Sequence, residues 1–275
     1  MPRQIIRTFG LDKDTLTFAQ RVKAGSGTTI LPNNLKDINN FVVGIKRMGL
    51  WNQMICWPMR SIHNAGKGST VYSLGGFGVY NGTMVNSPSW STDGVTFGGN
   101  TQYIQYSPNF TVDFTKGGYS VCAVWSGLGI PIISNEGSFI LFGSSDFVLA
   151  NTISTGVGGG TTWQPQSRNY NGFRYYNSLN QPIVGNIEYG WNAETLTLQR
   201  DGVDLSMLNI TSSTPTNGSY TMRTTGRTNT TTSATSRMSY LMTFPPSIGM
   251  TSATMKQIYN LSRQTLGLNL VLSIT

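Results

Sequence analysis

Charged residues, histidine, cysteine and long apolar runs are all scarce in this chain of 275 residues. One histidine and two cysteines are too few to favour a zinc centre, which needs several such ligands close together. No apolar run reaches the roughly 18 residues of a membrane-spanning helix. The first residues, MPRQIIRTFGLDKD, also lack the apolar stretch of a signal peptide. We therefore expect no membrane insertion.

Glycine, small polar residues and aromatic residues are abundant instead. The chain holds 32 glycines, 11% aromatic residues and 38% hydrophobic residues, while only 11% of residues are charged. This composition is too aromatic for a disordered chain and too rich in turn residues for a helical bundle. It favours a mainly β protein in which polar loops join many short strands.

The net charge of +8 is carried by basic residues that are scattered along the sequence. Nucleic-acid binding needs a basic stripe with interleaved aromatic residues, whereas the segment from Arg223 to Arg237 is rich in Thr and Ser. We therefore expect no nucleic-acid partner and favour contact with an acidic protein surface.

The N-terminal 75 residues are expected to form a segment of their own with one helix. Between Asn34 and Met48 apolar residues recur at helical spacing, and Gly49 follows as an exit signal. The segment has more apolar surface than one short helix can bury, so it must pack on its own β domain or on a partner. We favour a partner. The contact residues are then Phe41, Ile45, Lys46, Arg47, Leu50, Trp51 and Trp57.

From about residue 80 the pattern changes to the period of two that is typical of strands. Short alternating runs follow one another with turn signals between them, and they amount to about nine strands. The stretch MTSATMKQIYNLSRQTLG then returns to helical spacing after a Thr or Ser cap. This order divides the chain into residues 1–75, an anchoring or oligomerisation segment, and residues 76–275, a two-sheet sandwich with a short C-terminal helix.

Three motifs in the β region carry a resemblance to a fold family. They are Trp90 with Asp93-Gly94 and Phe97, the run TLTLQRDGV that begins at Thr195, and SATMKQIYNLSRQTLG near the C-terminus. In this order they resemble the concanavalin A-like, laminin G-like jelly roll. The resemblance implies a jelly-roll sandwich built from two sheets.

A second resemblance concerns the N-terminal segment. The sequence NNLKDINNFVVGIKRMGLWNQMICWPM joins a hydrophobic helix to Gly49-Leu50-Trp51 and then to Trp57-Pro58-Met59. It is similar to virion proteins of tailed bacteriophages that join such a module to a lectin-like sandwich. The resemblance implies a virion protein, assembled in the host cytoplasm, that contacts a major capsid or tail protein and forms a homo-oligomer.

Catalytic motifs are missing from the sequence. Sandwich enzymes that cleave glycans place two carboxylates about 5 Å apart across the sugar. The glutamates Glu136, Glu188 and Glu194 do not show this pattern, and no nucleophile motif accompanies His63. We therefore expect neither an enzyme nor a required cofactor.

Calcium binding is the one metal-binding role that the sequence leaves open. Laminin G-like domains often hold one calcium ion with Asp side chains and loop carbonyls, so the resemblance implies weak candidates in Asp93, Asp146 and Asp201. Asp201 lies in Arg-Asp-Gly, where a turn alone explains it, and no loop is dense in Asp and Asn.

Aromatic residues gather in the stretches TTWQPQSRNYNGFRYYN and IEYGWN. They supply six candidates for contact with a glycan or a partner: Trp163, Tyr170, Phe173, Tyr175, Tyr176 and Trp191. Pyranose rings stack on such side chains, but aromatic residues at subunit interfaces or in a core look the same in sequence. All three roles stay open.

These features lead to one functional hypothesis and two alternatives. The first is a non-enzymatic virion structural protein, a capsid decoration or head-fibre protein of a tailed phage, because the chain is short and has no shaft repeat. The second is a tail-associated receptor-binding protein that recognises host glycans through the aromatic candidates. The third is a glycan-cleaving enzyme.

Overall fold

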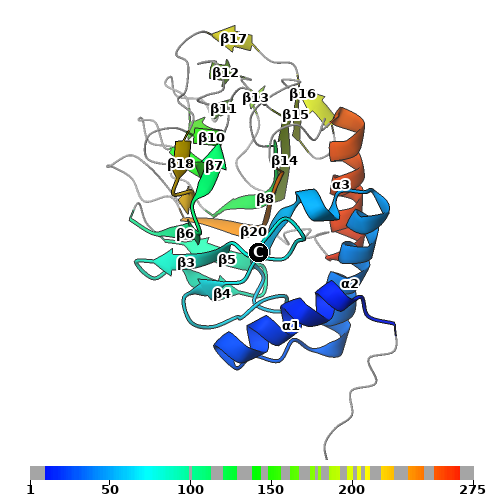
Figure 1. The fold of residues 1–275 in the computed structure, drawn as a ribbon. Coiled ribbons are helices and arrows are strands. Elements are labelled where there is room, and N and C mark those ends of the chain that lie inside the picture. Colours follow the sequence, from blue (N-terminus) through cyan, green and yellow to red (C-terminus); the bar gives the residue numbers. More distant parts are fainter. Residues whose placement is uncertain are drawn as a thin grey trace, which may run out of the picture.

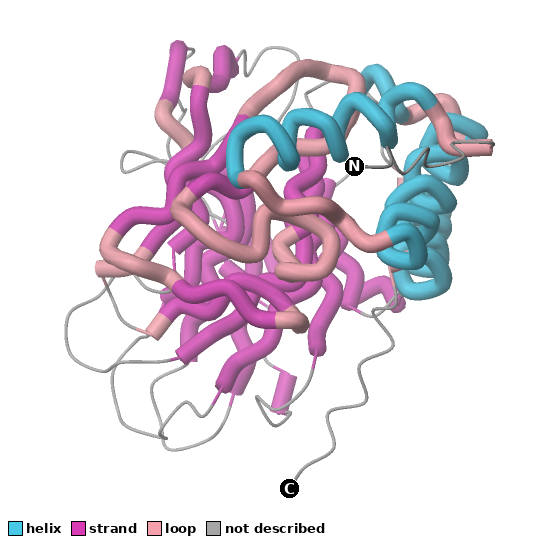
Figure 2. The backbone as a smooth tube through the Cα atoms, turned by 90° about the horizontal axis from the view of Figure 1, so that it is seen from below, coloured by secondary structure: helices cyan, strands magenta, loops and turns pink. Residues whose placement is uncertain are grey.

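The computed structural model of the chain is mainly β, with two large antiparallel sheets and with its α-helices gathered along one side of the strands (Figure 1, Figure 2). It describes residues 10–98, 101–112, 120–128, 138–143, 148–155, 162–166, 174–176, 179–180, 186–192, 197–200, 203–205, 208–210, 218–225, 235–244 and 251–266. The mainly β class predicted from composition and periodicity is confirmed.

The helices among the described residues are α1 (Lys13–Ser26), α2 (Pro32–Arg47), the short 3-10 helix η1 (Trp51–Gln53) and α3 (Ser252–Thr265). α2 and α3 confirm the two helices predicted from apolar spacing. One helix was expected in residues 1–75, and α1 is a second helix there. That expectation is corrected here: α1 buries Phe18 and Val22, only one large apolar side chain per turn, so its sequence shows little helical periodicity.

Capping residues fix both ends of α1. The Asp12 carboxylate accepts a hydrogen bond from the Asp14 N–H (2.9 Å) at the start of the helix. At the other end Gly27 adopts the left-handed conformation with φ 73°, and its N–H donates to the Lys23 carbonyl (2.9 Å). These two caps explain why a helix forms here despite the weak apolar pattern.

The first large sheet contains eight strands: β1 (Ile55–Pro58), β4 (Ser89–Ser91), β5 (Gly94–Phe97), β8 (Ser120–Leu128), β14 (Asn186–Asn192), β15 (Thr197–Arg200), β16 (Val203–Leu205) and β20 (Thr235–Phe244). Their order is β16-β15-β14-β8-β20-β5-β4, and β1 also pairs with β20. A two-residue turn of Thr92 and Asp93 joins β4 to β5, which pair as a hairpin.

The second large sheet also contains eight strands: β2 (Thr70–Val71), β3 (Asn81–Val85), β6 (Tyr103–Ser107), β9 (Ser138–Gly143), β10 (Val148–Thr155), β11 (Thr162–Gln166), β13 (Leu179–Asn180) and β19 (Arg223–Thr225). Their order is β13-β11-β10-β9-β19-β6-β3-β2. Two small antiparallel pairs complete the described strands: β12 (Arg174–Tyr176) with β17 (Leu208–Ile210), and β7 (Phe110–Val112) with β18 (Gly218–Tyr220).

The main core lies between the helices and the first sheet. Side chains alternate across a strand, and Tyr240, Met242 and Phe244 of β20 all join the cluster formed by the helices. From α2 this cluster receives Phe41 and Ile45, which are fully buried. The helices therefore cover one face of the first sheet.

The opposite face of the first sheet contacts the second sheet through aromatic rings. Trp57 of β1 packs against Tyr106 of β6, with 4.2 Å between the ring centroids. It also lies near Phe110 of β7, at 6.4 Å. Trp57 and Tyr106 are fully buried, so this contact joins the two sheets through a dry interior.

The segment expected as an N-terminal anchor is part of the same structure as the sheets. Its strand β1 pairs with β20 of the first sheet, and its strand β2 pairs with β3 of the second sheet. The expected division at residue 75 falls between β2 and β3. Residues 10–75 therefore share their hydrogen bonds and their core with the β-rich part of the chain.

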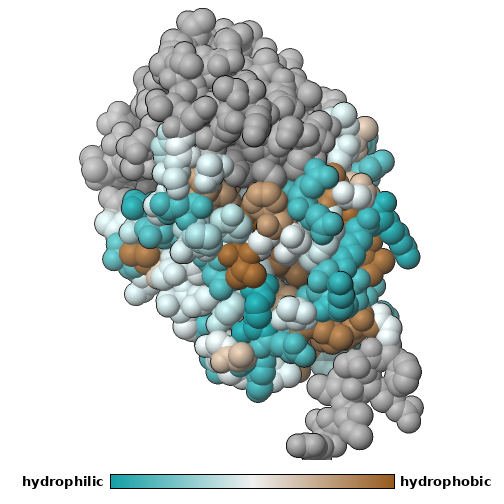
Figure 3. Space-filling model, in the orientation of Figure 1, coloured by the Kyte–Doolittle hydropathy of each residue, from teal (hydrophilic) through white to brown (hydrophobic). Residues whose placement is uncertain are grey.

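The described surface carries little apolar area. Its large exposed hydrophobic residues are Leu31, Phe77 and Val79. On the face shown in Figure 3, hydrophobic residues form small groups separated by hydrophilic ones. None of the described helices combines the length and the apolar character that crossing a membrane requires.

Candidate functional site

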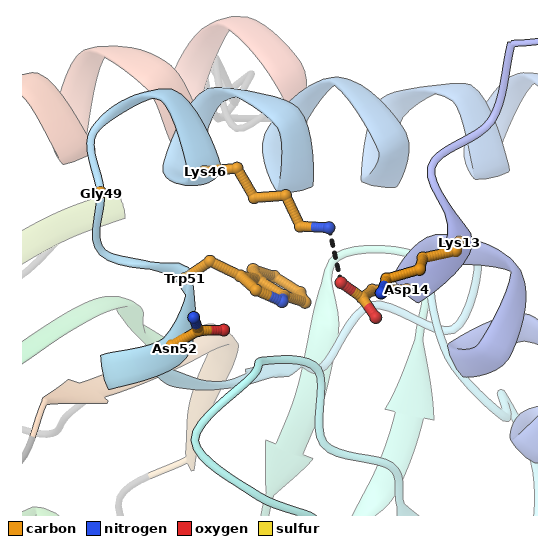
Figure 4. Close-up of a pocket in the computed structure, with 6 residues that line it drawn as sticks. All are labelled: Lys13, Asp14, Lys46, Gly49, Trp51 and Asn52. Carbon is orange, nitrogen blue, oxygen red and sulfur yellow. Dashed lines mark ion pairs between the residues drawn. The ribbon is translucent and has the colours of Figure 1, made fainter.

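A pocket of about 290 Å³ opens where the start of α1 meets the end of α2 and η1. Figure 4 shows the side chains around it, with the indole of Trp51 between Lys46, Asn52 and Asp14. Six residues line this space, which we call the Trp51 pocket: Lys13, Asp14, Lys46, Gly49, Trp51 and Asn52.

A sharp reversal of the chain after α2 builds one wall of the Trp51 pocket. Gly49 has φ 74°, a left-handed conformation that suits glycine, and its N–H donates to the Lys46 carbonyl (3.0 Å). The Leu50 N–H then donates to the Ile45 carbonyl (3.2 Å). This turn brings Trp51 back beneath α2, where only 7% of the residue stays exposed.

Lys46 joins α2 to the start of α1 through two carboxylates. Its Nζ lies 2.7 Å from Asp12 Oδ1 and 2.5 Å from Asp14 Oδ2. The same ammonium lies 5.3 Å from the centroid of the Trp51 ring, within the range of a cation–π contact. The Trp51 pocket is therefore held by an ion pair that also fixes the position of its aromatic wall.

The pKa values of Lys46 and Asp12 follow from this arrangement. Burial alone would lower the pKa of Lys46, but hydrogen bonds with Asp12 and Asp14 outweigh it and raise the pKa above its ordinary value. Burial alone would raise the pKa of Asp12, yet the hydrogen bonds from Lys46 and from the Asp14 N–H lower it. Lys46 and Asp12 thus stay charged over a wide pH range.

The attachment residues expected in the N-terminal segment mostly lie inside the protein. Five of them are buried in the chain's own core: Phe41, Ile45, Leu50, Trp51 and Trp57. Their apolar side chains contact the helices and sheets of this chain. The chain itself therefore buries the apolar surface for which a partner was expected. Of the two cations in that set, Lys46 is held by its ion pairs and Arg47 is exposed.

Four of the six aromatic candidates for glycan or partner contact lie among the described residues, where they belong to three different sheets. The structure places the backbone of Trp163 in β11 of the second sheet and that of Trp191 in β14 of the first. Tyr175 and Tyr176 belong to β12 of a two-stranded sheet. The other two candidates, Tyr170 and Phe173, lie outside the described residues.

Of the three calcium candidates, Asp93 lies among the described residues. The Asp93 carboxylate lies 3.4 Å from the Arg237 guanidinium, so a cation already occupies its neighbourhood. Asp146 and Asp201 lie outside the described residues. Within the part of the chain that the structure describes, no three His, Cys, Asp or Glu residues form a cluster that could hold a metal ion.

Sequence reasoning found two residues of the Trp51 pocket, Lys46 and Trp51, but assigned them to attachment. It missed Lys13, Asp14 and Asn52. A signal for the first two exists in the stretch LDKD, where Asp12 is a helix cap followed by charged residues of the first turn. Recognising α1 would have placed these side chains at a helix start, although not beside Trp51.

Comparisons with known proteins concern the fold. No protein-family model and no curated protein matches the chain. The chain is similar to a Trypanosoma rangeli sialidase, with 13% identity and a TM-score of 0.48, over 84% of this chain and 39% of that chain. It is also similar to the crystal structure of the HCR/D F1240A mutant, with 10% identity and a TM-score of 0.53, over 76% of this chain and 51% of that chain. At such identities the likeness is one of fold alone.

The prediction of a virion structural protein is wrong on these comparisons. The solved structures that the chain resembles include sialidases, one of them in complex with sialic acid, and HCR/D mutants. The expectation came from the apolar N-terminal segment, which the structure shows packed on its own sheets. The resemblance of that segment to phage proteins stays a prediction, but the function inferred from it is withdrawn.

Proposed function

We propose that this chain binds carbohydrate and that the Trp51 pocket holds one sugar unit. The observation that carries the proposal is the composition of the pocket wall, where one indole stands among a carboxylate, an amide and two ammonium groups. Trp51 is 7% exposed, so only a small part of its ring reaches the wall, and the polar side chains beside it face the hydroxyls of a sugar.

The hydrogen-bonding groups of the Trp51 pocket match those of a sugar. The Asp14 carboxylate accepts hydrogen bonds, the Asn52 amide donates and accepts them, and the ammonium groups of Lys13 and Lys46 donate. Sugar hydroxyls both donate and accept hydrogen bonds. Neighbouring hydroxyls of one sugar can therefore donate to the carboxylate and accept from an ammonium group at the same time. An apolar ligand would leave these groups unsatisfied, which is costly.

The size of the pocket limits the ligand. A volume of about 290 Å³ lies at the lower end of the roughly 300–1,000 Å³ that is usual for sites holding drug-sized molecules. The Trp51 pocket thus suits one monosaccharide, either free or at the end of a longer glycan.

The same pocket is proposed to bind without cleaving. Glycoside cleavage generally needs one carboxyl group that is protonated near neutral pH and a second that is ionised. Hydrogen bonding lowers the pKa of Asp12 despite its burial, and Asp14 is ion-paired with the same lysine, Lys46. Among the described residues that line the pocket, Asp14 is the one carboxylate, whereas cleavage generally needs two carboxyl groups.

We propose in addition that the two large sheets form a concanavalin A-like jelly-roll sandwich. The buried contact between Trp57 of the first sheet and Tyr106 of the second supports facing sheets. Such a sandwich would present α1, α2 and η1 on one outer face, with the Trp51 pocket between them.

A glycan array tests the proposal, followed by titration calorimetry of the sugars that bind. Asn52→Ala is expected to weaken binding at least tenfold, because it removes an amide from the pocket wall. Gln53→Ala is the matched control, since Gln53 is the next residue, is exposed and does not line the pocket. We expect its affinity to equal that of the wild type.

Three results would contradict the proposal. The first is an array without any bound glycan, and the second is an equal loss of affinity in the Asn52 and Gln53 variants. The third concerns cleavage: release of reducing sugar that Asp14→Asn abolishes would show a hydrolase at this site.

A further inference from the structure

We propose a second binding site, for a phosphate or sulfate group, at the exposed loop of Gly66, Lys67, Gly68 and Ser69, called here the glycine-lysine loop. This site goes beyond carbohydrate binding. It lies near Gly27 at the end of α1, whereas Lys13 and Asp14 of the Trp51 pocket lie at the start of that helix.

The backbone of the glycine-lysine loop has the conformation of an anion-binding concavity. Gly66 has φ 66° and Gly68 has φ 67°, whereas Lys67 between them does not have a positive φ. Alternation of the sign of φ along successive residues turns their N–H groups toward one side of the chain, as in the backbone nests that bind phosphate.

Hydrogen bonds hold the carbonyl side of this loop against the body of the protein. The Gly68 carbonyl accepts from the Trp90 indole N–H (2.9 Å), and the Ser69 carbonyl accepts from the Met84 N–H (2.7 Å). Just before the loop, the Ala65 carbonyl accepts from the Thr28 hydroxyl (2.6 Å). The carbonyls of Ala65, Gly68 and Ser69 are therefore occupied by donors of the protein itself.

The N–H groups of the same loop are available to a ligand. Among the described residues, the four N–H groups from Gly66 to Ser69 have no hydrogen-bond partner. Lys67, Gly68 and Ser69 are exposed, so an ion from solution can reach them. An oxyanion with several acceptor oxygens could bind more than one of these donors at once.

Two lysine side chains converge beside the loop. The Lys23 ammonium donates to the Gly27 carbonyl (3.2 Å). The Lys67 ammonium lies 3.7 Å from the position that a Cβ on Gly27 would take. Among the described residues, neither lysine forms an ion pair with a carboxylate. Two unneutralised cations near one glycine favour an anion between them and the loop.

The charge of the surrounding segment strengthens this preference. Residues 1–75 contain ten Lys or Arg and three Asp, a net charge of +7, whereas residues 76–275 contain nine basic and eight acidic residues, a net charge of +1. Nearly all of the net charge of +8 thus belongs to the segment that carries the glycine-lysine loop. Its field raises the local concentration of anions at low salt.

Nuclear magnetic resonance of the isotope-labelled full chain tests this site directly. Sodium phosphate and sodium sulfate are titrated at an ionic strength held constant with sodium chloride. We expect saturable shifts of the amide signals of Gly66, Lys67, Gly68 and Ser69, with millimolar affinity. Lys67→Gln is expected to weaken the binding at least fivefold.

Lys36→Gln is the matched control, because Lys36 is also an exposed lysine of the same basic segment but belongs to α2 and not to the loop. It should bind phosphate as the wild type does. A second variant, Gly68→Ala, tests the backbone: a Cβ there would meet no atom within 4 Å, so the change acts through the strained φ of 67°. We expect it also to weaken binding.

Glucose 6-phosphate distinguishes the two sources of the anionic group. If glucose 6-phosphate binds as tightly as inorganic phosphate, the site accepts a phosphate group carried on a larger molecule. If glucose 6-phosphate binds more weakly, the site is one for the free ion. Either result agrees with the proposal. Shifts no larger with phosphate or sulfate than with chloride would overturn it. An equal loss of affinity in the Lys36 and Lys67 variants would also overturn it.

Discussion

At the scale of single residues, the Asn64 side chain makes four hydrogen bonds that a substitution would remove. Its buried amide donates to the carbonyls of Pro58 and Tyr72 (2.7 and 2.9 Å) and accepts from the N–H groups of Ala65 and Tyr72 (2.8 and 3.1 Å). Unsatisfied buried groups cost about 1–3 kcal/mol each, so Asn64→Ala should lower the free energy of unfolding by about 3–5 kcal/mol. Denaturant unfolding measures this, and exposed Asn40→Ala should stay within about 0.5 kcal/mol of the wild type.

His63 should make stability depend on pH in the acidic range. It is buried, and burial together with the charge of Arg60 lowers its pKa to about 4. The unfolded chain takes up a proton near pH 6.5, so stability is full above that pH and falls as the pH is lowered toward 4. The loss attributable to His63 should be about 2–3 kcal/mol.

Comparison with His63→Gln tests this contribution, because carboxylates that do not contact His63 titrate alike in both proteins. Asp37, whose Oδ2 lies 3.7 Å from His63 Nε2, is the described exception. Urea unfolding at pH 7 and pH 4.5 should show a smaller pH-dependent loss in the variant. Identical losses in both proteins would mean that His63 is not held neutral in the folded state.

At the scale of elements, the packing of α2 against α3 depends on Gly44. A Cβ at this position would lie 2.4 Å from Leu261 Cδ1, so the two helices approach closely only because Gly44 has no side chain. Gly44→Ala should destabilise the wild type by about 1–3 kcal/mol through overpacking. In the Leu261→Ala background the same change should be neutral, or stabilising by up to about 1 kcal/mol, because alanine favours helices. A double-mutant cycle measures this coupling. If the effects of the two substitutions on the free energy of unfolding are additive, Gly44 and Leu261 do not pack against each other.

The same pair shows which elements a sequence can predict. α2 was predictable because Ile38, Phe41 and Ile45 repeat at helical spacing and point to a single buried face. Nothing in that repeat shows that the face packs on β20 and α3, far along the chain. The sequence therefore indicates how much apolar surface must be buried, but not whether a partner or the chain itself buries it.

At the scale of the whole molecule, the mainly β class could be predicted from the composition and from the alternation of polar and apolar residues, whereas the Trp51 pocket could not. The Trp51 pocket joins Lys13 and Asp14 from a helix that has little apolar periodicity to Trp51 and Asn52 from a turn after the next helix. The ion pairs of Lys46 help to bring these residues together, as does the hydrogen bond from the Asp12 N–H to Asn39 Oδ1 (2.7 Å). Side chains that meet through tertiary contacts of this kind leave no regular spacing to recognise.

The most direct test of the account is a crystal structure of the full chain with the tightest-binding sugar from the glycan array. We predict electron density for one sugar ring in the Trp51 pocket, with hydrogen bonds to Asp14 and Asn52. Density for the sugar elsewhere, for example against Trp163 or Trp191, with the Trp51 pocket empty would contradict the assignment of the site.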